Sequence, residues 1–159
     1  MRTLAIDLGT RRVGLALSDE GGRLATAYDV LSVGSPEAAI QPVCDVVRKQ
    51  SVQRIVVGLP LNMDGTAGPA AQATIAWARQ LSAACAVPVI FVDERLSSFA
   101  AEQDLLARRR AGQKLTRRKR RQRLDALAAA RFLQDFLDGK LSPIPVAQDH
   151  PPTRGHERD

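Results

Sequence analysis

The stretch that decides the fold is LAIDLGTRRVGLALS, which spans residues 4–18. Residues 4–8 form an apolar run with one acid, Asp7, and this pattern predicts a buried strand. Gly9 begins a turn, and residues 13–18 alternate in a way that predicts a second strand. A parallel pair would need a crossover of about a dozen residues, so this short connection predicts an antiparallel hairpin.

The remaining sequence extends this hairpin into an α/β domain. Glycines at 21–22 precede a third predicted strand at 24–33, which completes an antiparallel meander. Ser35 and Pro36 predict the start of a helix. The later elements are a strand at 54–57, a loop at 58–69, a helix at 70–84, a strand at 87–92 and helices at 99–109 and 118–137. This order predicts a five-stranded mixed sheet, in which parallel strands follow the meander and helices cover both faces.

The length of 159 residues suits a single core. We expect a domain over residues 1–138 and a Pro-rich tail over 139–159 that is poorly ordered. Cys44 and Cys85 lie in apolar helical patterns, which indicate neither a disulfide framework nor a zinc site. The N-terminus lacks a signal-peptide pattern and no apolar run is long enough to span a membrane, so we expect a cytoplasmic protein.

Charge is distributed unevenly along the chain. The net charge is +6, yet ten basic residues lie between 108 and 123 without an acid among them, and elsewhere 13 basic residues face 17 acids. This basic segment comprises Arg108, Arg109, Arg110, Lys114, Arg117, Arg118, Lys119, Arg120, Arg121 and Arg123. Such a segment indicates a polyanionic partner. A membrane surface would require large apolar residues among the charges, and only Leu115 interrupts them, so nucleic acid is the expected partner.

Both histidines, His150 and His156, lie in the predicted tail. A Ser-His-Asp triad, a cysteine–histidine pair or a histidine-ligated zinc would therefore have to draw on that tail. An enzyme with this sequence is thus expected to rely on carboxylates. Most of the 17 acids, Asp135 among them, occupy predicted turns or solvated helix faces.

Asp7 and Glu94 occupy positions that suit catalysis. Asp7 interrupts an apolar strand, where a buried carboxylate needs a cation or strong hydrogen-bond donors. The alternative to a catalytic role is that the Asp7 side chain accepts a hydrogen bond from the turn that follows the strand. Glu94 follows an apolar strand, at the edge where open α/β sheets bind ligands. Its neighbour Asp93 is a rival for that role, and either acid has an ordinary alternative as the partner of Arg95.

Asp125 is the third candidate. It lies on the apolar face of a helix, and the alanines that follow it let this helix approach the sheet closely. The alternative is an ordinary ion pair with Arg121, one turn earlier. Two divalent cations need several carboxylate oxygens at one point. Spacing along the chain leaves open whether Asp7, Glu94 and Asp125 meet.

Four blocks of sequence together resemble one known family. They are AIDLGT at 5–10 with RVG at 12–14, VGLPL at 57–61 with DGT at 64–66, DERLSS at 93–98, and DALAA at 125–129. In this order, over residues 1–138, they resemble the YqgF or RuvX family of pre-16S rRNA nucleases and Holliday junction resolvase-like proteins.

The resemblance implies a ribonuclease H-like fold and a cytoplasmic hydrolase that processes the 5′ end of pre-16S rRNA. It implies that Asp7, Glu94 and Asp125 bind Mg²⁺ or Mn²⁺ and are catalytic, and we expect a two-metal mechanism. We expect nucleic-acid contacts from Thr10, Arg11, Arg12, Asn62 and Arg95, and from the basic segment between Arg108 and Arg121.

Two other functions remain open. A resolvase of branched DNA needs two active sites, and so a symmetric homodimer. The more distant RuvC resolvases carry two acids one turn apart in their last helix, whereas Ala128 stands at the second position here. A non-catalytic RNA-binding factor of ribosome assembly would need the basic segment but not the acids. An actin-like ATPase needs two such domains, which 159 residues cannot supply.

Overall fold

The computed structural model describes residues 1–96 and 117–146, and in the second range it describes side chains from residue 125 onward. Its strands are β1 Thr3–Leu8, β2 Arg12–Ser18, β3 Ala25–Ser32, β4 Arg54–Leu59 and β5 Val89–Asp93. Its helices are the short 3-10 helices η1 Pro36–Ala39 and η2 Glu94–Leu96 and the α-helices α1 Ile40–Lys49, α2 Pro69–Cys85 and α4 Arg117–Leu137. The helix expected at 99–109 and the end of the expected tail lie outside the described residues.

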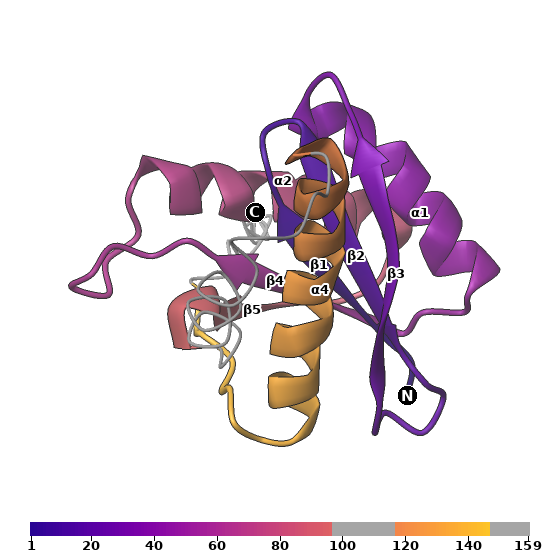
Figure 1. The fold of residues 1–159 in the computed structure, drawn as a ribbon. Helices are drawn as coiled ribbons and strands as arrows, with labels where there is room; N and C mark the ends of the chain where they lie inside the picture. The colour runs from indigo at the N-terminus through magenta and orange to yellow at the C-terminus, as the bar shows by residue number, and fades with distance from the viewer. Residues whose placement is uncertain (97–116, 147–159) are drawn as a thin grey trace, which may run out of the picture.

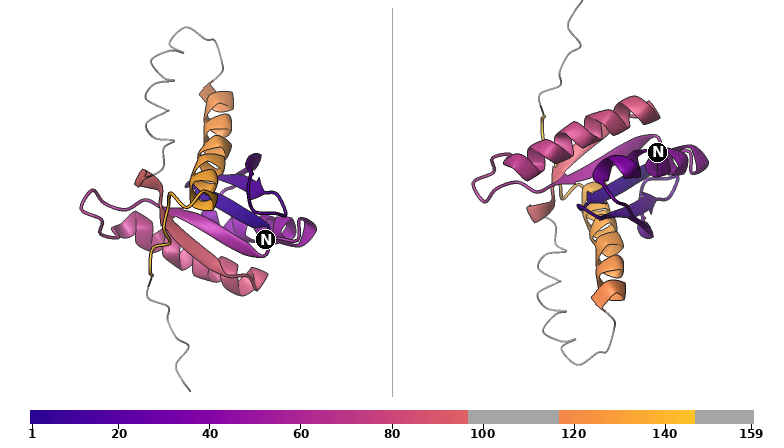
Figure 2. Two further views of the ribbon diagram at one scale, coloured as in Figure 1. Left: turned by 90° about the horizontal axis from the view of Figure 1, so that it is seen from below. Right: turned by 90° about the horizontal axis from the view of Figure 1, so that it is seen from above.

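The five strands form one mixed sheet in the order β3-β2-β1-β4-β5. The meander β1–β3 is antiparallel, whereas β1, β4 and β5 run parallel. Helix α4 crosses one face of the sheet, and α1 and α2 lie on the other (Figure 1). Figure 2 shows the same three layers from below and from above. The predicted sheet with helices on both faces is therefore confirmed.

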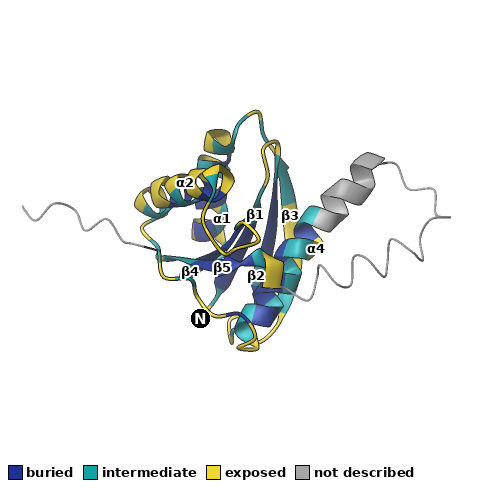
Figure 3. Cartoon of the chain, turned by 90° about the vertical axis from the view of Figure 1, so that its left-hand side faces the viewer, coloured by how far each residue is buried: buried dark blue, intermediate teal, exposed yellow. Residues whose placement is uncertain are grey.

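Alternation along β1 divides the core into two layers. Leu4 and Ile6 pack on the side of α1 and α2, whereas Ala5 packs with Phe132 of α4. Figure 3 shows the buried residues concentrated in the inner strands of the sheet and on the inner sides of the helices, whereas β3 is largely outside the core. Because successive side chains of a strand point to opposite faces, Asp7 shares the α4 side with Ala5.

Local signals for the helix start are confirmed, but one strand is longer than expected. The Ser35 side chain accepts a hydrogen bond from the backbone N–H of Ala38, and η1 forms the first turn before α1. The strand expected at 54–57 continues to Leu59, because Gly58 pairs with Val92 of β5. The residues expected to open a loop at 58 are therefore the end of β4.

The segment after α4 packs back against the domain. Leu141 is buried, and Ile144 forms an antiparallel bridge with Phe91 of β5. In this return, the backbone N–H of Leu141 donates to the Asp135 carbonyl at 3.3 Å. Asp135 is 3% exposed, so the expectation of a solvated side chain is wrong. The first part of the expected tail, up to Val146, thus contacts the core. Among the described helices, none has the length and apolar character needed to cross a bilayer.

Candidate active site

All three candidate acids come from elements that meet at one edge of the sheet. The parallel strands β1 and β5 flank β4, so Asp7 near the end of β1 and Glu94 directly after β5 reach the same edge. Asp7 faces α4, and α4 carries Asp125. The candidate site therefore lies between the carboxyl ends of the parallel strands and helix α4.

Asp125 reaches this edge because α4 contacts the sheet at a glycine. Gly14 of β2 is the register partner of Asp7. A Cβ atom on Gly14 would lie 2.2 Å from the backbone oxygen of Asp125. No side chain fits this gap, so the backbone of α4 lies directly on β2 beside Asp7. Ala126 and Ala129 are buried next to this contact, as their small size predicts.

Glu94 lies over a second glycine. A Cβ atom on Gly58 would be 2.9 Å from Oε2 of Glu94 and 3.3 Å from a ring carbon of Phe132. The missing side chain at Gly58 leaves the space that the Glu94 carboxylate occupies. Glu94 is consequently directed over the end of β4, on the side of the sheet that α4 covers.

The three carboxylates interact electrostatically. Burial and then the negative charges of Glu94 and Asp125 raise the pKa of Asp7 to about 7. Burial, together with the charge of Asp93, also raises the pKa of Glu94. Nearby negative charges disfavour the charged form of a carboxyl group, so the raised pKa of Asp7 reflects negative charge close to it. Glu94 and Asp125 are therefore near enough to Asp7 for their charges to act on it, and these are the three acids that the sequence predicted.

The chemistry of these donors fits a hard divalent cation. Mg²⁺ and Mn²⁺ bind carboxylate oxygens, and a cation would relieve both the burial of Asp7 and its repulsion by the other acids. Within residues 1–96 and 117–146, no three acidic, cysteine or histidine side chains lie in positions that would hold a metal ion as they stand.

Asp93, the rival of Glu94, is bound to Arg95. Arg95 donates from Nε to Asp93 Oδ1 at 3.0 Å and from Nη2 to Oδ2 at 2.8 Å. The backbone N–H of Arg95 also donates to Asp93 Oδ1, at 3.1 Å. The side-chain bond lowers the pKa of Asp93, which is 7% exposed. Asp93 therefore has the ordinary ion pair that the sequence allowed, and Glu94 is the acid coupled to Asp7.

Arg12 lies against Asp125, with Nε donating to Oδ2 at 2.9 Å. Their side chains are 30% and 29% exposed. The sequence suggested Arg121 as the ordinary partner of Asp125, but Arg12 forms this ion pair and the side chain of Arg121 is not described. Thr10 and Arg11 are exposed in the turn between β1 and β2, immediately after the strand that carries Asp7.

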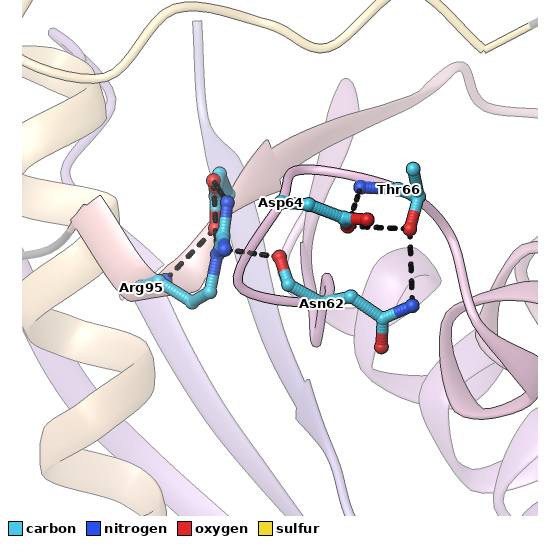
Figure 4. Close-up of polar contacts among 5 residues, drawn as sticks. Asn62, Asp64, Thr66 and Arg95 are labelled. Atoms are coloured by element: carbon cyan, nitrogen blue, oxygen red, sulfur yellow. Dashed lines mark hydrogen bonds and ion pairs between the residues drawn. The ribbon is translucent and has the colours of Figure 1, made fainter.

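The loop over residues 60–68 connects β4 to α2 and is built on its own hydrogen bonds. The backbone N–H of Gly65 donates to the carbonyl of Asn62 at 2.9 Å, and Nδ2 of Asn62 donates to Oγ1 of Thr66 at 3.1 Å. Asp64 Oδ1 accepts from the backbone N–H of Thr66 at 3.0 Å. Arg95 donates from Nη1 to the same Asn62 carbonyl (Figure 4). Asn62 and Arg95, both expected to contact nucleic acid, thus belong to one bonded network.

The basic segment is only partly described. Its residues from 108 to 114 lie outside the described residues, and those from 117 form the first turns of α4 without described side chains. The described part of the basic segment and Asp125 lie on the same helix, α4, with the basic residues nearer its N-terminal end.

The structural roles of Gly14 and Gly58, and the bond from Arg95 to the Asn62 carbonyl, were not predicted from the sequence, whereas the pairing of Asp93 with Arg95 was one of its alternatives. A glycine inside a strand often marks the close approach of another backbone or side chain, so Gly14 carried a signal in the sequence for its contact with α4. Aspartate side chains often accept a hydrogen bond from the backbone N–H two residues later, and Asp93 does so with Arg95.

This sheet, with helices on both faces and acids at the ends of its parallel strands, defines a protein of the ribonuclease H-like class. The solved structure of T. thermophilus RuvC in complex with Holliday junction substrate resembles it, with a TM-score of 0.56 and 18% identity. The match covers 91% of this chain and 99% of that one. This likeness confirms the predicted fold.

The chain belongs to the RuvX family, whose model, described as Holliday junction resolvase, matches residues 1–139. A relative from Anaeromyxobacter sp. (strain K) is 47% identical over 87% of this chain and 97% of its own length. One from Acidiphilium cryptum (strain JF-5) is 41% identical over 91% of this chain and 88% of its own length. Both bear the name "Putative pre-16S rRNA nuclease". The chain is therefore a nuclease, and the predicted family is confirmed.

Proposed function

We propose that this nuclease hydrolyses a phosphodiester bond near the 5′ end of pre-16S rRNA, with Mg²⁺ or Mn²⁺ held by Asp7, Glu94 and Asp125. The convergence of these acids from β1, the end of β5 and α4 is the observation that carries the proposal. The names of the relatives support the substrate. Because bacterial rRNA precursors are made in the cytoplasm, the proposal also places the enzyme there.

Each of the three carboxylates has a defined part in holding the metal. Asp7 would supply oxygens from the sheet, Asp125 from the helix above it, and Glu94 from the far side of β4. When bound, a pair of divalent cations supplies a water of lowered pKa and stabilises the leaving oxygen. Asp7 must release its proton before its oxygens can serve as ligands, because metal ligation requires the carboxylate form.

Basic and hydroxyl groups near the acids would hold the substrate backbone. Thr10 and Arg11 project from the hairpin turn beside Asp7, where a phosphate adjacent to the cleaved bond would lie. Arg12 retains further N–H groups beyond the one bonded to Asp125. The basic segment would bind successive phosphates without reading bases.

Cleavage of an end-labelled single-stranded RNA that carries the 5′ leader of 16S rRNA tests the proposal. We expect cleavage only with Mg²⁺ or Mn²⁺, loss of cleavage in Asp7→Asn, and retained RNA binding in that variant. Undiminished cleavage by Asp7→Asn would remove Asp7 from the mechanism. RNA binding by the native protein with no cleavage under any metal would instead indicate a non-catalytic assembly factor.

Junction resolution is the second candidate, since the family model carries that description. It requires two active sites in a homodimer, and Ala128 stands one turn after Asp125 where RuvC resolvases have another acid. We therefore expect a four-way DNA junction to be cleaved far more slowly than the leader RNA. Faster cleavage of the junction, by a protein that is dimeric in solution, would favour the resolvase.

A further inference from the structure

The side chain of Arg95 connects two segments that flank the carboxylates. Its Nε and Nη2 donate to the Asp93 carboxylate, and its Nη1 donates to the carbonyl of Asn62 in the loop between β4 and α2. A guanidinium holds such a fork rigidly, because its N–H groups lie in one plane. Figure 4 shows Arg95 reaching toward Asn62 from the end of β5.

In the 60–68 loop, Arg95 binds the Asn62 carbonyl, and the same carbonyl closes a turn of the loop. The Asn62 carbonyl accepts from both Gly65 N–H and Arg95, and Thr66 closes the rest of the loop through Asp64. The Asn62 side chain lies over Gly68, where a Cβ atom would be 3.0 Å from Asn62 Oδ1. The turn is thus internally organised, and Arg95 connects it to the end of β5.

At the end of β5, the two bonded residues Asp93 and Arg95 lie on either side of Glu94 in the chain. Asp93 accepts from the backbone N–H of Arg95, two residues on, so the peptide groups on either side of Glu94 are restrained. Asp93 is also in register with Leu59 at the end of β4. The Glu94 carboxylate is directed over Gly58 from this restrained backbone.

We propose that Arg95 is a positioning residue that holds Glu94 and the 60–68 loop as one unit beside the metal-binding acids. It acts through Asp93 and the Asn62 carbonyl and not by binding a phosphate. The effect on catalysis rests on the proposed function, whereas the connection itself does not. Asp93 and Arg95 form a clamp in this sense, and removing either of them should free both Glu94 and the loop.

Three variants test the clamp: Asp93→Asn, Arg95→Gln and the double variant. Kinetics on the leader RNA with Mn²⁺ should show kcat reduced about 10- to 100-fold in each, with KM and the salt dependence of RNA binding unchanged. The double variant should be no worse than the single ones, because both substitutions break the same connection. Arg95→Lys should not restore kcat, since an ammonium cannot donate in the same fork.

Hydrogen exchange in metal-free protein provides a readout that needs no nuclease activity. The Gly65 amide should exchange faster in Asp93→Asn and Arg95→Gln than in the native protein. Arg48→Gln is the matched control, because it breaks an exposed arginine–aspartate pair with Asp45 on α1. It should leave Gly65 exchange and kcat unchanged.

Two results would overturn the proposal. If Arg95→Gln raises KM and lowers the salt dependence while Asp93→Asn has no effect, Arg95 is a phosphate contact. If Gly65 exchanges at the native rate in both variants, Arg95 does not hold the loop. Absence of cleavage by the native protein would count against the proposed function, and the exchange rates would still decide whether the clamp exists.

Discussion

Gly14 of β2 and Asp125 of α4 meet backbone to backbone, with 2.2 Å between the position of a Gly14 Cβ and the Asp125 carbonyl oxygen. Asp7 is the register partner of Gly14. The backbone contact between α4 and β2 therefore lies at the point where an acid of the helix comes near an acid of the sheet. Packing and the candidate site depend on the same contact.

Gly14→Ala should damage both stability and activity. The new methyl group must push α4 away from β2, and overpacking of this kind destabilises by about 1–3 kcal/mol. Displacing Asp125 by about 1 Å should lower cleavage about 100-fold. Urea unfolding and RNA cleavage measure the two effects. Gly34→Ala is the control, because a Cβ there meets nothing within 4 Å, and native cleavage by Gly14→Ala would contradict the assignment.

Asp7→Asn should stabilise the metal-free protein at neutral pH. The pKa of Asp7 is about 7 in the folded protein against an ordinary 3.8, so the folded state binds the extra proton between these values. The stability linked to this proton is complete below pH 3.8 and is lost as pH rises to about 7, by up to about 1.4 kcal/mol per unit.

Urea unfolding in EDTA measures this linkage. The native protein should lose stability between about pH 5 and 7, whereas Asp7→Asn should lose less over the same range. Adding Mn²⁺ should stabilise the native protein and not the variant. An Asp7→Asn protein that is less stable than the native one at about pH 8 in EDTA would show that the Asp7 carboxylate is not under electrostatic stress.

Arg12→Gln should separate metal binding from RNA binding. The ion pair with Asp125 is partly exposed, so its loss should change stability by less than about 1 kcal/mol. Removing a positive charge beside Asp125 should tighten Mn²⁺ binding severalfold, whereas RNA binding should weaken with a salt slope smaller by about one. Calorimetry with Mn²⁺ and filter binding of RNA measure both. Weaker binding of Mn²⁺ would contradict this role of Arg12.

Gly58→Ala should act through Glu94. A Cβ atom would lie 2.9 Å from Glu94 Oε2, so the carboxylate must move. We expect cleavage to fall, and Glu94→Gln to cause little further loss in the Gly58→Ala background, because the two substitutions share one target. Full additivity of the two losses in single-turnover cleavage would mean that Gly58 acts through Phe132 instead.

Local patterns in the chain predicted most of the fold. Strands were recognisable from short apolar runs, and the Ser35 cap from its side chain and the following proline, since these signals depend on neighbours in sequence. The order of elements then restricted the sheet topology, because crossovers between parallel strands are right-handed. The extension of β4 through Gly58 was not predictable in this way, because it depends on pairing with β5.

The sequence by itself determined the element order, the three candidate acids and the family resemblance. Tertiary structure alone decided which groups those acids meet. Arg12 and Asp125 are 113 residues apart, and their pairing depends on how closely α4 approaches Gly14. Asp135 is likewise buried, although the sequence pattern placed it among the acids of turns and solvated faces. The periodicity of apolar residues indicates which face of a helix or strand a residue occupies. The distances between elements are decided only when their whole surfaces pack together.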